Sequence, residues 1–224
     1  MPNDQMKPRP PPRVSIFNLP LEIRHQIYDS LIEERVFTWP VPSVGFASIS
    51  HWPPSPDVLD IHPQIAHEFR NHFYSTTNLR FTLGRAFRQW QYHDHPRISD
   101  GDAEYITKVE VMFIIGDKTL NSSVESLCLD LRRRVSYLCN LFSTMARLKV
   151  VVISWTDMTR SGLWDAKASI LLGLGQLNTE ATANIRKVQI VVGNVVVTDS
   201  DDRNRIIMTI NSLMAGSDKM SVPY

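Results

Sequence analysis

From about residue 106 onward, the sequence alternates between β-branched runs and amphipathic helical patterns, and this alternation constrains the fold more than any other feature. Strand-like segments lie at Lys108–Ile115, Leu148–Trp155 and Arg186–Val197, and they start about forty residues apart. Valine and isoleucine favour strands, and strands linked by helical crossovers lie parallel with right-handed connections. The pattern therefore predicts a short parallel strand–helix repeat.

Two helical patterns fill the intervals between these strands. Ser122 and Glu125 form a capping-box pattern at the start of the first helix. A second helix is expected over Trp164–Leu177. The first helix carries an unbroken apolar stripe, made of Val124, Leu127, Leu131, Val135, Leu138, Phe142 and Met145.

The third strand segment contains Gly193-Asn194, a dipeptide that favours a hairpin turn. A last helix is expected from about Arg203 to Leu213. Acidic residues in a first turn stabilise a helix N-terminus, and three precede or open this helix: Asp199, Asp201 and Asp202. The repeat is similar to a leucine-rich-repeat stack, although the usual asparagine ladder signature is missing.

The N-terminal part lacks this alternation of strand and helix patterns. Residues 1–13 are proline-rich, which indicates a disordered or polyproline-like tail. Asn18 is the expected cap of a short helix, and Pro20 suits its first turn. The aliphatic residues of this helix recur every four positions and predict one apolar stripe, made of Ile23, Ile27 and Leu31 and widened by Tyr28 and Ile32.

Five prolines interrupt the segment from Phe37 to Asp57, which is expected to be a loop. A second helix follows Pro63, a strand is expected at Asn78–Leu83, and a short helix at Arg85–Tyr92. The expected fold class is α+β to α/β. The expected organisation is a tail (1–13), a helical module (14–83, with a proline-rich loop at 37–57) and an α/β repeat domain (84–224).

Two blocks in the helical module resemble a known family. The opening LPLEIRHQIY (19–28) resembles the LPxEIRxxIY opening of fungal F-box-like proteins, and IHPQIAHEFRNHFYSTTNLRF (61–81) resembles the segment that follows in the same family. The chain departs from the family at His62-Pro63, where a cysteine–arginine pair is usual, and in the length of its proline-rich insertion.

The resemblance implies that the first helix contacts a Skp-family adaptor of a cullin–RING ubiquitin ligase. It implies these adaptor-contact residues: Leu19, Pro20, Glu22 and Ile23, to which the stripe adds Ile27 and Leu31. A helix this short is not stable alone, so its stripe must be buried in a core or a partner. Two alternatives stay open: Leu19–Leu31 packs on the second helix of this chain, or the protein is a non-ligase scaffold whose F-box-like helices cap a single α/β domain.

Composition and motifs indicate a non-catalytic protein without cofactor or metal. Cys128 and Cys139 are too few for a zinc site. His67 and His72 lie about 140° apart on a helix, so they cannot share a metal. A net charge of +1 gives no field for nucleic acid or membrane. With no apolar run near the roughly 20 residues that span a bilayer, the expected location is cytosol or nucleus, and the expected partners are the adaptor and an unknown target protein.

Overall fold

A six-stranded mixed sheet organises the structure, and the chain adds its strands in sequence order. The computed structural model describes residues 15–84, 100–116, 123–159, 163–179 and 188–214. The first three strands are antiparallel neighbours, and the last four run parallel. The strands are β1 (Phe37–Val41), β2 (Gly45–Ile49), β3 (Leu79–Leu83), β4 (Lys108–Ile115), β5 (Val150–Asp157) and β6 (Gln189–Val197). The predicted alternation of parallel strands and helices after residue 106 is confirmed.

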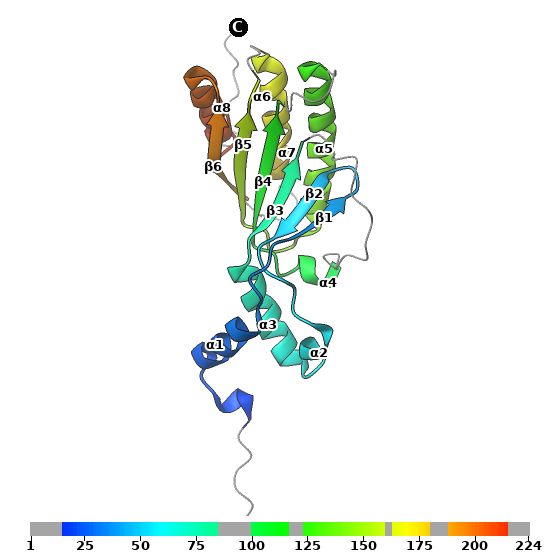
Figure 1. Cartoon of the computed structure of the whole chain (residues 1–224), viewed down its shortest axis with the longest axis vertical. Helices are drawn as coiled ribbons and strands as arrows, with labels where there is room; N and C mark the ends of the chain where they lie inside the picture. The colour runs from blue at the N-terminus through cyan, green and yellow to red at the C-terminus, as the bar shows by residue number, and fades with distance from the viewer. Residues whose placement is uncertain (1–14, 85–99, 117–122, 160–162, 180–187, 215–224) are drawn as a thin grey trace, which may run out of the picture.

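The long helices lie behind the strands, on one face of the sheet (Figure 1). These are α5 (Val124–Thr144), α6 (Trp164–Gly173) and α8 (Ser200–Met214), of which α6 packs against both others. Side chains alternate between the two faces of a strand, and the helix-facing residues of β4 are fully buried: Val109, Val111, Phe113 and Ile115. The stripe predicted on α5 is likewise buried from Leu127 to Phe142. Ser123 caps this helix, and Ser122 lies outside the described residues.

The first part of the segment expected to be a proline-rich loop instead forms the β1–β2 hairpin, so the prediction of a loop at 37–57 is wrong for residues 37–49, whereas residues 50–55 form neither helix nor strand. β1 is an edge strand, where a proline such as Pro40 removes no hydrogen bond of the sheet. The turn places Ser43 and Gly45 at positive φ of 63° and 147°. Only glycine fits the second position, because a Cβ there would lie 2.4 Å from the Thr82 carbonyl oxygen.

Two further local predictions are corrected. Gly193-Asn194 does not turn a hairpin: β6 is one strand, and the two residues lie where its register with β5 shifts. A Cβ on Gly193 would approach Ser154 Oγ to 2.4 Å, so the glycine permits close packing on β5. The expected helix at 164–177 is two helices, because the chain turns at the buried Leu174 after α6 and continues as α7 (Gln176–Thr179).

The helices at the N-terminal end form a separate small layer below the sheet (Figure 1). A 3₁₀ turn, η1 (Ile16–Asn18), precedes α1 (Leu21–Leu31), and α2 (Pro56–Leu59) precedes α3 (Pro63–Thr76). The expected cap at Asn18 is wrong: Ser15 caps η1, and Pro20 is the N-cap residue of α1.

Helix α3 joins the two parts of the structure. Its first half packs Ile65 and Phe69 in the small core, and its second half packs Phe73 and Tyr74 in the main core. The short α4 (Asp100–Ala103) lies beside it, where Asp102 pairs with Arg70 at 3.3 Å. The expected strand at 78–83 is confirmed as β3, which pairs with both β2 and β4. The sheet therefore continues across residue 84, where the sequence suggested a domain boundary, and the expected helix at 85–92 lies outside the described residues.

Candidate protein-docking site

The N-terminal unit, defined as η1, α1, α2 and the first half of α3, is held together by a small apolar core. Tyr28, Ile65 and Phe69 are buried in it, and the rings of Tyr28 and Phe69 lie 5.0 Å apart. Five more apolar side chains pack around them: Ile16, Phe17, Ile32, Val58 and Leu59. A core of this size needs additional contacts to fix the orientation of α1 on α3.

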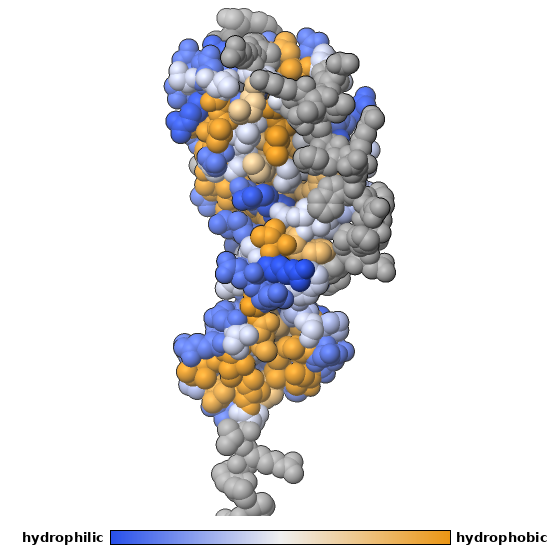
Figure 2. Space-filling model, in the orientation of Figure 1, coloured by the Kyte–Doolittle hydropathy of each residue, from blue (hydrophilic) through white to orange (hydrophobic). Residues whose placement is uncertain are grey.

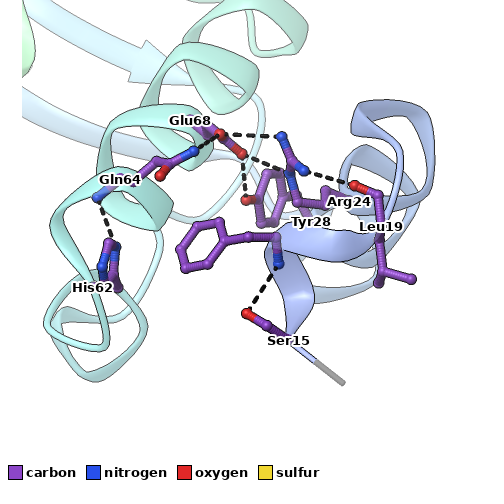
Figure 3. A network of polar contacts seen from close by, with 8 residues as sticks. Ser15, Leu19, Arg24, Tyr28, His62, Gln64 and Glu68 are labelled. Carbon is purple, nitrogen blue, oxygen red and sulfur yellow. Dashed lines mark hydrogen bonds and ion pairs between the residues drawn. The ribbon is translucent and has the colours of Figure 1, made fainter. Parts of the chain in front are cut away.

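A polar network centred on Glu68 supplies those contacts (Figure 3). Arg24 donates to Glu68 Oε2 at 2.8 Å and to the Leu19 carbonyl oxygen at 2.7 Å. Tyr28 Oη and Gln64 Nε2 also donate to the Glu68 carboxylate, at 3.2 and 2.9 Å. Burial alone raises the pKa of Glu68, but the hydrogen bonds from Gln64, Arg24 and Tyr28 outweigh it and hold this pKa below its ordinary value.

The opposite side of the α1–α3 contact is also polar. His72 Nε2 lies 2.6 Å from Asp29 Oδ1, and the His72 ring stacks on His25 at 4.3 Å. His67 points elsewhere and contacts the Tyr105 hydroxyl at 3.0 Å. The two histidines of α3 thus have different partners, and the described residues contain no group of three or more potential metal ligands.

With Arg24 and Tyr28 facing α3, the aliphatic stripe of α1 faces solvent. Ile23 and Leu31 are 40% and 52% exposed, and Ile27 is half-buried. None of the three belongs to the apolar residues packed on either core. The prediction that Leu19–Leu31 packs on the second helix of the chain is therefore confirmed for the side of α1 that carries Arg24 and Tyr28, but not for the exposed residues of the stripe. Tyr28 was expected to widen the stripe, whereas the apolar pattern did not predict the role of Arg24.

The remaining candidate contact residues lie beside the stripe. Pro20 and Glu22 are exposed, and Glu22 lies in the first turn of α1, as predicted. Leu19 is half-buried, with its carbonyl oxygen fixed by Arg24. The structure thus places the six candidate residues on α1 and on the two residues before it, and a space-filling view shows an apolar surface at this end of the molecule (Figure 2).

A second accessible surface is the face of the sheet opposite the helices, which no described helix covers (Figure 1). A row of polar contacts crosses four strands there. Arg80 pairs with Glu110 at 2.8 Å, and Ser154 Oγ donates to Glu110 at 2.6 Å. The backbone N–H of Asn194 in turn donates to Ser154 Oγ at 3.1 Å. Aliphatic side chains such as Met112 and Val152 lie half-buried along the same face.

The structure also contains a buried charge cluster that sequence reasoning missed. Lys167 Nζ of α6 lies 2.7 Å from Asp157 Oδ2 at the end of β5, and 3.6 Å from Asp202 in the first turn of α8. Thr159 donates two hydrogen bonds to the other Asp157 oxygen. Nearby, burial raises the pKa of the Cys128 thiol. Since the cluster connects three elements and buries Lys167 and Asp157, it fixes α6 and α8 on the sheet.

Comparisons with protein-family models, with curated proteins and with solved structures give no match to this chain. Within the described residues, no helix has the length and apolar character needed to cross a membrane.

Proposed function

We propose that the N-terminal unit is an F-box-like docking module that binds a Skp-family adaptor through the exposed side of α1. The observation that supports this is the orientation of α1, which uses Arg24 and Tyr28 to attach to its own chain and leaves Ile23 and Leu31 to solvent. Burying an aliphatic side chain of this size in a partner contributes about 1.5–3 kcal/mol. The polar network around Glu68 lies on the other side of α1, so it leaves the exposed aliphatic side chains free to contact a partner.

In this proposal the sheet domain recruits the target of a cullin–RING ubiquitin ligase, in the cytosol or nucleus. Its helices lie on one face, as in a leucine-rich-repeat-like stack, and its other face is available to a target protein. Arg80, which is held by Glu110 and has a side chain that is 43% exposed, would offer a polar contact on an otherwise aliphatic surface. The chain has no catalytic role in this assembly.

A binding experiment with a purified fungal Skp-type adaptor tests the proposal. We expect capture by the wild-type chain at micromolar concentration, and loss of capture in Ile23→Asp and Leu31→Asp. Leu129→Asp is the matched control, because Leu129 is an exposed leucine on the distant helix α5. Circular dichroism must show wild-type helix content in all three variants. Absence of capture by the folded wild-type chain would refute adaptor binding.

The alternative is a non-ligase scaffold in which the N-terminal unit caps a single α/β domain. It is favoured by the continuous sheet across residue 84 and by α3, which contributes to both cores. Terminal caps are required where repeats stack. A cut between residues 50 and 55 leaves α1, β1 and β2 on one fragment and α3 with β3–β6 on the other. Release of a folded C-terminal fragment by such a cut would contradict this alternative, because a single domain should not fold without these elements.

A further inference from the structure

The apolar surface of the N-terminal unit extends well beyond the α1 stripe. Leu21 is 45% exposed at the start of α1, and Ile61, between α2 and α3, is 67% exposed. Between them lie the half-buried side chains of η1 and α2, including Phe17 and Leu59. In the space-filling view, orange residues form a continuous band across this end, from α1 to α2 (Figure 2). Helix α2 lies in the insertion that departs from the family pattern, whereas Ile61 opens the second block that resembles the family.

Acidic side chains surround this band. Residues 15–61 contain six carboxylates and two arginines, a net charge of −4, whereas the whole chain carries +1. Both arginines are engaged within the chain, Arg24 by Glu68 and Arg35 over the ring of Trp52 at 5.2 Å. Glu22 on the α1 side and Asp57 and Asp60 on the α2 side are all exposed. Negatively charged side chains therefore flank both ends of the apolar band.

We propose that this band docks an amphipathic helix of a partner protein, with basic side chains flanking its apolar face. The inference rests on the proposed docking function of the N-terminal unit and adds the chemistry of the partner and a second half of the site, at α2 and Ile61. Apolar side chains fill the band, and lysine or arginine side chains reach Glu22, Asp57 and Asp60. Two copies that met through this band would bring their acidic side chains together, and an anionic membrane carries the wrong charge for the band.

The test uses a synthetic amphipathic helical peptide of about 18 residues, roughly five turns, with leucines along one face and lysines beside them. Its counterpart has glutamate in place of each lysine. Binding of both fluorescently labelled peptides to the full chain is measured by anisotropy at low and high ionic strength. We expect the lysine peptide to bind at least tenfold more tightly than the glutamate peptide, with a difference that shrinks at high ionic strength.

Two independent variants locate the binding. Ile61→Asp and the double variant Asp57→Lys/Asp60→Lys should each weaken the lysine peptide tenfold or more. The matched controls are Met208→Asp, an exposed apolar residue on α8, and Glu125→Lys/Asp165→Lys, two exposed acids in first turns of other helices. All the substituted positions are exposed, and thermal unfolding must match that of the wild-type chain.

Equal affinity for the two peptides, or equal effects of the site and control variants, would overturn the inference. The result is separable from the adaptor experiment. If adaptor capture is lost with Ile23→Asp but unchanged with Ile61→Asp and with the lysine double variant, the proposed function stands and this inference fails. If the peptide behaves as expected but no adaptor is captured, the surface is a docking site for another basic partner.

Discussion

Replacing Lys167 by methionine should destabilise the whole sheet domain. The Lys167 side chain is 0% exposed and that of Asp157 is 2% exposed, with 2.7 Å between Nζ and Oδ2. Methionine fills a similar volume but leaves the Asp157 carboxylate buried without its counter-charge. Breaking a buried pair by removing one partner costs about 3–5 kcal/mol. In a domain of this size, 1 kcal/mol lowers the melting temperature by about 2–4 °C, so the expected fall is about 6–20 °C.

Thermal and urea unfolding followed by circular dichroism measure this loss. The matched control is Lys108→Met at the exposed start of β4, which should change the free energy of unfolding by no more than about 0.5 kcal/mol. A double variant, Lys167→Met/Asp157→Asn, should recover most of the loss, because the asparagine oxygen still accepts from Thr159 without a buried charge. A melting temperature of Lys167→Met within about 2 °C of wild type would refute the reasoning.

Three other predictions follow from the contacts described above. The pKa of Glu68 is lowered in the folded chain, so its contribution to stability is present above the ordinary glutamate pKa and is lost as pH falls through the folded value. Urea unfolding between pH 7 and pH 3 should therefore show a smaller loss for Glu68→Gln than for wild type, and an equal loss would contradict the network. Gly193→Ala should lower stability by about 1–3 kcal/mol, because its Cβ would lie 2.4 Å from Ser154 Oγ; the neighbouring exposed Asn194→Ala serves as the control in the same urea titration. Burial raises the pKa of the Cys128 thiol, so alkylation by iodoacetamide at pH 8 should be slow in the native chain and fast in urea, and fast native labelling would show that α5 opens readily.

Local patterns in the sequence determined most of the parallel part of the fold. The strand at 108–115, the strand expected at 148–155 and found at 150–157, and the long helix between them follow from β-branched runs and an apolar stripe. Both signals depend on residues close in the chain. The sequence also predicted the acidic first turn of α8 and the helix that begins at Pro63. At the candidate site, sequence identified the aliphatic stripe of α1 and its four-residue spacing.

What the tertiary structure alone decided was where each surface lies. Prolines at 40 and 42 excluded a helix, but only the position of β1 at the sheet edge made a strand possible there. The amphipathic pattern of α1 did not say which side faces α3, because Glu68, distant in sequence, selects Arg24 and Tyr28. For the same reason the helical pattern did not predict that Lys167 is buried, because its two acidic partners, Asp157 and Asp202, lie on other elements. Contacts between distant residues fix burial and orientation, and a single sequence records the residues of such contacts without recording their pairing.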